Sequence, residues 1–198
     1  MNNNYDELTK IDALDFRNNN IQLLLSYVLR IIGVLVFGLL FILWIALIKP
    51  GASMNLKTVL NIRIAHLPPA VSILLIIIDV LFVLYFHELV HASIFYITHR
   101  QPPKIGMRGF IIFAAAPSHL LKRQQLLMNA LAPFFFISLL GCFALVLVPD
   151  HLIAWIIVPA VVNAAASGGD FMAVAWAMRH GKQVLYRDDG DIITAFLK

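Results

Sequence analysis

The chain has 198 residues, of which 61% are hydrophobic and only 13% are charged. In soluble domains about a quarter of the residues are charged, so this composition excludes an ordinary soluble protein and suits a lipid environment. The net charge of +4 does not come from a separate basic domain, because the Lys and Arg residues flank apolar segments. We therefore expect no nucleic-acid partner. The sole cysteine, Cys142, lies in an apolar run and excludes a disulfide framework or a CxxC motif.

The polar segment 1–21 lacks the short apolar core and the cleavage site of a signal peptide, so we expect a cytosolic N-terminal tail. Four apolar stretches follow, and each exceeds the roughly 20 residues that a helix needs to cross a bilayer. They span residues 22–48, 70–97, 124–148 and 151–178. Backbone polar groups must be paired in lipid and no strand-like alternation is present, which predicts helices. The fold prediction is an all-α integral membrane protein, with a four-transmembrane-helix bundle at 22–178 and a cytosolic C-terminal tail at 179–198.

Basic residues gather on one side of the predicted membrane. They lie in the N-terminal tail, between the second and third apolar stretches, and after the fourth, whereas the opposite side carries only Lys49, Lys57 and Arg63. The positive-inside rule then places both termini in the cytosol.

The connection at 98–123 differs from an ordinary polar loop. Two short apolar runs flank a turn signal at Arg108-Gly109, and the second run ends at Pro117. This pattern indicates a β-hairpin-like or re-entrant loop between the second and third helices. Such backbone is tolerated at membrane depth only where protein or a wet cavity surrounds it.

The second apolar stretch contains His87-Glu88-Leu-Val-His91. Two histidines four apart on a helix project from nearly the same face, so both imidazoles can bind one zinc ion while the intervening Glu88 reaches its water. Glu88 then acts as general base in peptide hydrolysis. A chance HExxH is the alternative, but three ionisable side chains in five residues of a membrane span are costly and usually mark function.

The third ligand follows from elimination. No glutamate occurs after Glu88, and Ile94 and Ile97 occupy the positions where a metzincin needs Gly and His. The candidates are the carboxylates after Glu88 (Asp150, Asp170, Asp188, Asp189 and Asp191), together with His99, His119, His151, His180 and Cys142. Among these carboxylates only Asp170 lies well inside an apolar stretch, at a depth similar to that of the histidines. The alternative is that Ser167 and Asp170 form a capping-box-like restart of a broken helix.

Three further polar residues lie within apolar stretches. Asn129 and Asn163 could donate to a developing oxyanion or to substrate backbone, although interhelical hydrogen bonding is the commoner role. Asp79 lies two turns before His87 and could orient a ligand histidine, relay protons or bond a neighbouring helix. We favour a structural role or a contact with a ligand histidine for Asp79.

The motifs HELVH and Ser167-Gly-Gly-Asp170, joined through a basic loop, resemble those of the bacterial membrane proteins named putative zincin peptidases. The plan is also similar to the site-2 protease family of intramembrane metalloproteases, although that family has Asp followed by Gly, whereas here two glycines precede Asp170. The resemblance implies His87, His91 and Asp170 as ligands of one zinc ion per chain, Glu88 as general base, and a bacterial cytoplasmic membrane.

The predicted function is an intramembrane zinc metalloprotease that hydrolyses membrane-embedded or juxtamembrane peptide bonds near the cytosolic face. Its partners would be the lipid bilayer and a membrane protein or peptide substrate. The alternatives are a divalent-metal transporter and a catalytically silent zinc-binding scaffold. Glu88 discriminates them, because a site that only holds metal does not need an unligated carboxylate between its histidines.

Overall fold

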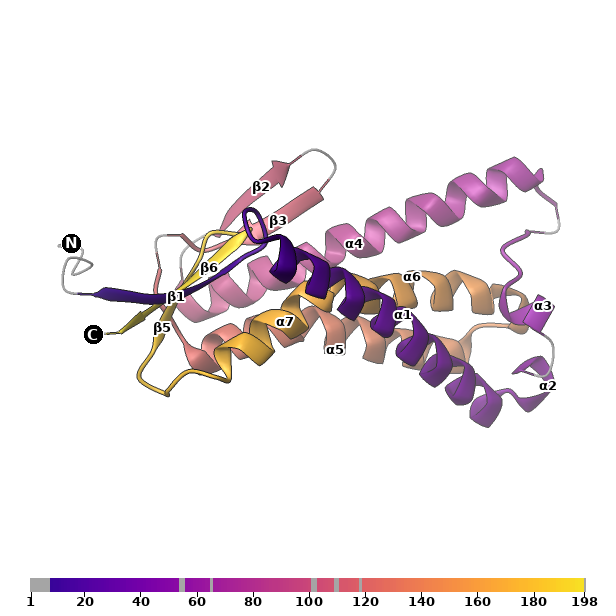
Figure 1. Cartoon of the computed structure of the whole chain (residues 1–198). Helices are drawn as coiled ribbons and strands as arrows, with labels where there is room; N and C mark the ends of the chain where they lie inside the picture. The colour runs from indigo at the N-terminus through magenta and orange to yellow at the C-terminus, as the bar shows by residue number, and fades with distance from the viewer. Residues whose placement is uncertain are drawn as a thin grey trace. The chain divides into compact units, whose positions relative to one another are not determined.

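The computed structural model describes residues 8–53, 56–64, 66–100, 103–108, 111–117 and 119–197 (Figure 1). The chain divides into two compact units. The first comprises Met1–Leu29, Glu88–Pro133 and Gly168–Lys198, and the second comprises Arg30–His87 and Phe134–Ser167. Because the long helices are continuous across these boundaries, each unit contains parts of several helices.

Four helical segments are long and apolar enough to cross a membrane, as the sequence predicts. They are α1 (Asn20–Ile48), α4 (Pro69–His99), α5 (Arg123–Leu147) and a composite fourth segment, Asp150–Ala177. The fourth consists of the 3₁₀ helix η1 (Asp150–Leu152), α6 (Ile153–Ala166) and α7 (Gly168–Ala177). Two short helices, α2 (Pro50–Ser53) and α3 (Leu56–Val59), lie between α1 and α4.

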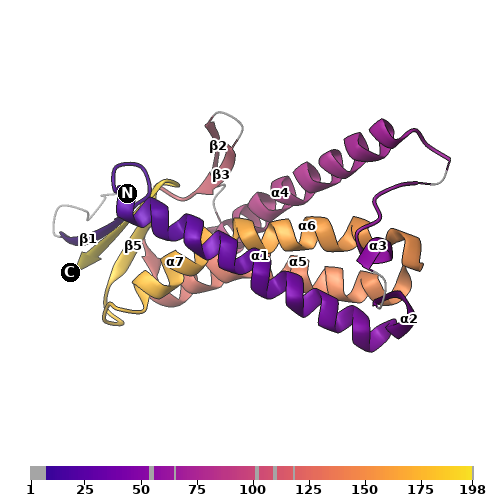
Figure 2. The ribbon, with the colours of Figure 1, turned by 45° about the vertical axis from the view of Figure 1, so that its right-hand side comes forward.

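The structure also contains a four-stranded antiparallel sheet (Figure 2). The prediction of long helices is confirmed, but the prediction that the chain is all-α is wrong. The order of the sheet is β1 (Thr9–Asp15), β6 (Ile192–Leu197), β5 (Leu185–Asp188) and β4 (Leu121–Lys122). The strands come from three distant parts of the sequence, and β1 pairs with β6. Strands this short have too few residues to show a clear alternation of apolar and polar side chains, so their sequence pattern did not predict the sheet.

The predicted hairpin between the second and third long helices is confirmed, and Gly109 of the expected turn lies outside the described residues. Strands β2 (Lys104–Arg108) and β3 (Ile111–Ala115) pair antiparallel. The β5–β6 turn passes Phe113 of this hairpin at Gly190, which has a φ of 90°. A Cβ atom at Gly190 would lie 2.7 Å from the Phe113 ring, so both the positive φ and the close approach require glycine there.

Each unit has its own apolar core. In the first unit α4, α5, α7 and the sheet contribute buried residues, among them Phe95, Leu126, Trp176, Tyr186 and Ile193. In the second unit α1, α5 and α6 contribute residues that include Phe41, Ile45, Leu145 and Ile153. Outside these cores the long helices expose large apolar side chains along their length, which suits contact with lipid.

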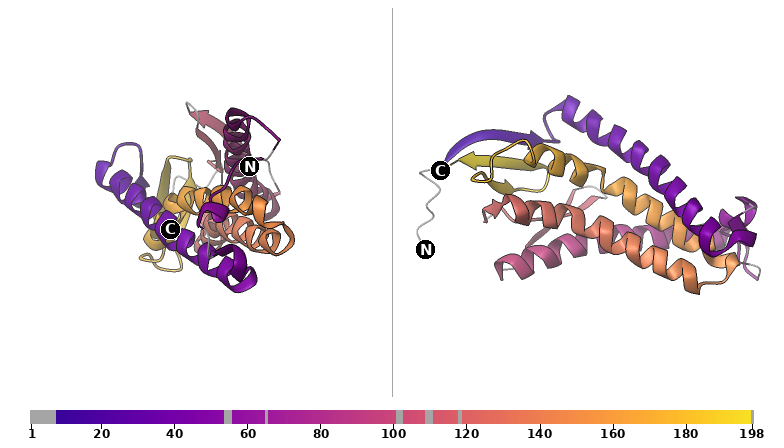
Figure 3. Two further views of the ribbon diagram at one scale, coloured as in Figure 1. Left: turned by 90° about the vertical axis from the view of Figure 1, so that its right-hand side faces the viewer. Right: turned by 90° about the horizontal axis from the view of Figure 1, so that it is seen from below.

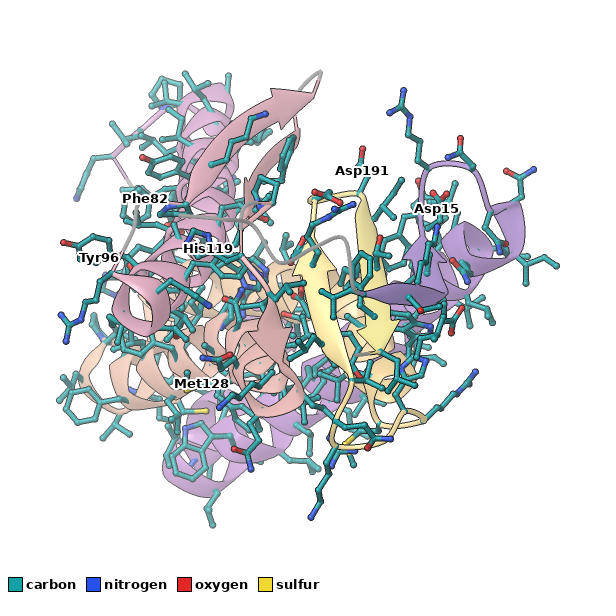
Figure 4. All side chains as sticks on the ribbon, turned by 90° about the vertical axis from the view of Figure 1, so that its left-hand side faces the viewer. Asp15, Phe82, Tyr96, His119, Met128 and Asp191 are labelled. Atoms are coloured by element: carbon teal, nitrogen blue, oxygen red, sulfur yellow. The ribbon has the colours of Figure 1, made fainter. Side chains whose placement is uncertain are left out.

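Strand β1 is attached to α7 through Asp12. The Trp176 indole Nε1–H donates to Asp12 Oδ2 at 2.8 Å, and His180 Nε2 lies 3.2 Å from the same oxygen. The ends of β1 and of the β5–β6 turn also lie together, since Phe16 N–H donates to the Asp191 carbonyl (Figure 4 labels Asp191 and Asp15). Asp12 therefore connects the N-terminal strand to the helix that carries Asp170.

We expect Asp12→Ala to lower stability by about 1 kcal/mol, because it removes the acceptor of a partly buried indole N–H. For a chain of this size the midpoint of thermal unfolding should fall by about 2–4 °C. Asp189→Ala is the control, since Asp189 pairs with Arg187 at the surface and should have a smaller effect. Equal midpoints for Asp12→Ala and the parent chain would contradict this role.

Candidate metal centre

Helix α4 positions the HExxH motif. It begins at Pro69, a residue suited to a first helical turn, and continues without a glycine or a second proline to His99. It ends where Arg100 takes a φ of 56°, the left-handed conformation that commonly ends helices. His87 and His91 lie one turn apart on this helix and are 4% and 8% exposed, so both imidazoles face the protein interior.

The break between α6 and α7 positions Asp170. Ser167 has a φ of −66° and a ψ of 0°, and both its N–H and its hydroxyl donate to the Asn163 carbonyl. Ser167 therefore bonds backward into α6, which differs from the forward bond that the capping-box alternative requires. Asp170 lies in the first turn of α7, where the partial positive charge of a helix N-terminus stabilises a carboxylate.

His91 and Asp170 meet within the first unit, with His91 Nε2 3.5 Å from Asp170 Oδ1. His87 completes the group from the preceding turn of α4, and the three ligand atoms lie within 4.8 Å of one another. Ligand atoms bound 2.0–2.1 Å from a tetrahedral zinc ion are separated by about 3.3 Å. Two imidazole nitrogens and one carboxylate oxygen at these separations fit a catalytic zinc site with a fourth position left for water.

Both histidines have a hydrogen-bond partner on Nδ1. His87 Nδ1–H donates to Asn163 Oδ1 at 2.8 Å. His91 Nδ1 lies 3.0 Å from the Asn129 carbonyl oxygen and 3.2 Å from Asn129 Oδ1, and donates to them. Because amide and carbonyl oxygens only accept, these bonds favour a proton on Nδ1 and make Nε2 the nitrogen suited to a metal.

These contacts give Asn129 and Asn163 a place in the site that differs from the expected oxyanion or substrate contacts. Both are buried, at 3% and 0% exposure, and both contact a ligand histidine. The Nδ2 group of Asn163 has no hydrogen-bond partner among the described residues. A donor therefore remains beside His87, and an oxyanion contact from Asn163 stays a prediction.

Glu88 and Asp79 occupy different positions on α4. Glu88 follows His87 directly, is partly exposed, and interacts electrostatically with His91. Asp79 lies two turns before His87, and no contact with the histidines is found among the described residues. The structure therefore gives no support to an orienting role for Asp79.

Asp188, at the end of β5, is an acidic residue near the site that the search for a third ligand set aside, because it lies outside the apolar stretches. Its carboxylate accepts a hydrogen bond from Gly190 N–H at 2.8 Å, and its carbonyl accepts one from Ala116 N–H. Burial raises the pKa of Asp188 to about 7, while the Gly190 hydrogen bond and the nearby His91 oppose this shift and Asp170 adds to it. Only the strand pairing brings Asp188 near His91 and Asp170, and no local motif marks it.

A sequence profile of the family described as putative zincin peptidase matches residues 80–185. The match includes the HExxH motif, the hairpin, both asparagines and Asp170. No curated protein and no solved structure matches the chain.

We expect Asn163→Ala to weaken zinc binding by about 10- to 100-fold, because His87 loses the acceptor that holds its Nδ1 proton. Asn129→Ala is the matched comparison and should lose less, since the Asn129 backbone carbonyl still accepts from His91. Competition with a zinc-binding dye measures both affinities. Equal affinities for Asn163→Ala and the parent chain would contradict the proposed orientation of His87.

Asp188 predicts a pH dependence of the metal-free protein. The folded carboxyl keeps its proton to about pH 7, whereas the unfolded one loses it near 3.8. Between these values the unfolded state binds fewer protons, so the free energy of unfolding falls as the pH rises. Asp188→Asn should remove this part of the slope and Asp189→Asn should retain it, as measured by denaturation of the zinc-free protein at pH 5 and pH 7.5. An unchanged slope in Asp188→Asn would contradict the prediction.

Proposed function

Because the chain belongs to the family of putative zincin peptidases, we propose that it is an integral membrane zinc metallopeptidase whose centre lies within the membrane-spanning helices. One observation carries the proposal: His91 and Asp170, from distant parts of the sequence, meet at zinc-ligand spacing, with His87 one turn away and Glu88 beside it. This grouping of two imidazoles and a carboxylate suits a catalytic zinc site.

In this proposal His87, His91 and Asp170 hold one zinc ion. Bound zinc would polarise the scissile carbonyl and lower the pKa of a water molecule. Glu88 accepts the proton of that water and delivers it to the leaving amine. Asn129 and Asn163 keep the histidines in the tautomer that offers Nε2.

The proposed substrate is a membrane-embedded or juxtamembrane peptide segment. The histidines are part of a helix that is apolar enough to cross a membrane, and His91 lies eight residues before its end. At 1.5 Å per residue that is about 12 Å, a depth that supports reacting atoms below the membrane surface at one end of the span. The distribution of basic residues supports a cytosolic location for that end and for both termini.

Two other functions compete with hydrolysis. A divalent-metal transporter needs ligands along the depth of several spans, whereas the single group of three potential ligands among the described residues is His87, His91 and Asp170. A silent zinc-binding scaffold needs the ligands but has no use for Glu88. A Glu88 variant that keeps zinc therefore distinguishes a hydrolase from both alternatives, because only a hydrolase would lose its activity.

We expect Glu88→Gln to bind one zinc ion per chain and to lower peptidase turnover by about 10²–10⁴-fold, because it removes the general base and retains the shape of the side chain. Zinc content and cleavage of a panel of transmembrane peptides are measured in the reconstituted full chain. His91→Ala should lose both zinc and activity, and His151→Ala, at the far end of the fourth span, should retain both. Full activity in Glu88→Gln, or no zinc in the parent chain, would overturn the proposal.

A further inference from the structure

The first half of α4 is the least covered part of the membrane-spanning helices. Within an 18-residue apolar stretch of α4 only 11% is buried, compared with 50% in the corresponding stretch of the fourth span. Within the second unit, α4 runs apart from α1 and α6 toward its Pro69 end (Figures 1, 2 and 3). Large side chains on its outward face are mostly exposed, including Leu81 at 59% and Phe82 at 62% (Phe82 is labelled in Figure 4).

Asp79 lies on the stripe of α4 that faces inward. This stripe follows helical spacing through Ser72, Ile76, Asp79, Val83 and His87. It is buried at both ends, because Ser72 is 1%, Ile76 7% and His87 4% exposed. Between them Asp79 and Val83 are only partly buried. The middle of the stripe is therefore less covered than its two ends, and this partly open stretch leads along α4 to His87.

The Asp79 carboxyl group has neither a hydrogen-bond donor nor a counter-ion among the described residues. It is the eleventh residue of α4, about 15 Å from the start of the helix, and thus deep in the span. An ionisable group in that environment is costly unless a polar or charged group meets it. Because the chain itself supplies none in the described part, a partner of opposite charge is the occupant that this position fits.

We propose that the open stripe of α4 around Asp79 docks the transmembrane helix of a peptide substrate that carries a Lys or Arg side chain near mid-membrane. The inference rests on the proposed peptidase function and specifies its substrate class. Asp79 lies eight residues before His87, about 12 Å along the helix axis. The basic side chain would therefore lie on the same α4 stripe as the scissile bond. It would be closer to the Pro69 end of the helix than that bond.

The geometry gives this docking two parts. The apolar side chains of the stripe beside Asp79 pack against the substrate helix, which by itself selects nothing among apolar segments. The ion pair between Asp79 and the basic residue adds selectivity and sets the register, because it fixes which substrate residue lies beside Asp79. A register fixed 12 Å away from the zinc ligands determines which peptide bond reaches Glu88.

The test measures binding without cleavage. The full-length Glu88→Gln chain, loaded with zinc in nanodiscs, is titrated with a labelled Leu/Ala transmembrane helix that carries a single Lys at successive depths. Binding should be strongest with Lys at mid-membrane and about three- to twentyfold tighter than for the all-apolar helix, as expected for a polar contact between membrane helices. Asp79→Asn should remove this preference.

A charge-reversal variant and a matched control distinguish loss of the ion pair from misfolding of the protein. Asp79→Lys should no longer bind the Lys-bearing helix and should instead bind a helix with Glu at the same depth. A misfolded protein would bind neither. Ile77→Asn places a polar group on the outward face of α4 and should leave the preference intact. A Lys preference that persists in Asp79→Asn, or no preference in the parent background, would overturn the inference. A change in dimerisation with no change in peptide binding would assign the stripe to a second copy of this chain and overturn it as well.

Cleavage is then measured separately with Glu88 present. Tight binding of the Lys-bearing helix without cleavage would contradict the proposed hydrolase and leave the docking stripe supported. Cleavage with no dependence on Asp79 would support the hydrolase and reject the docking stripe.

Discussion

The contact between His91 and Asp170 is the interaction on which the rest of the centre depends. An imidazole and a carboxylate within apolar helices are costly unless each meets a partner, and here Nε2 and Oδ1 lie 3.5 Å apart. The opposite side of the imidazole is fixed by Asn129, and His87 is fixed in the same way by Asn163. Each of these polar groups thus meets a partner, and the His91 ring keeps Nε2 directed at the Asp170 carboxylate.

The position of Asp170 depends in turn on elements outside the spans. Helix α7 carries Asp170 in its first turn, and its last turn is held by the sheet, since the Tyr186 hydroxyl donates to the Ala177 carbonyl. Arg123, at the start of α5, donates to the His180 carbonyl just after α7. The small sheet therefore contributes to the centre by holding the short helix that brings Asp170 beside His91.

Helix α4 combines two properties that usually exclude each other. Its second half buries the face that carries His87, His91 and Phe95, whereas its first half exposes large apolar side chains and leaves Asp79 only partly buried. A peptidase that works on membrane segments needs both, because the reacting atoms require a defined polar shell and the substrate has to approach from lipid. The proposed ion pair at Asp79 would connect the two halves by fixing the register of the substrate along the helix.

The sequence by itself determined the four long apolar helices, the helical setting of HExxH and the hairpin, because each depends on hydrophobicity, helical spacing or turn residues close together in the chain. It also indicated Asp170 by elimination, since few carboxylates lie within apolar stretches. Only the tertiary structure decided the sheet, the contacts of Asn129 and Asn163 with the histidines, and the place of Asp188. The pairing of β1 with β6 joins the two ends of the chain, and Asp188 approaches His91 through that sheet. Such non-local contacts leave no pattern in the neighbouring residues, so no local sequence signal could have revealed them.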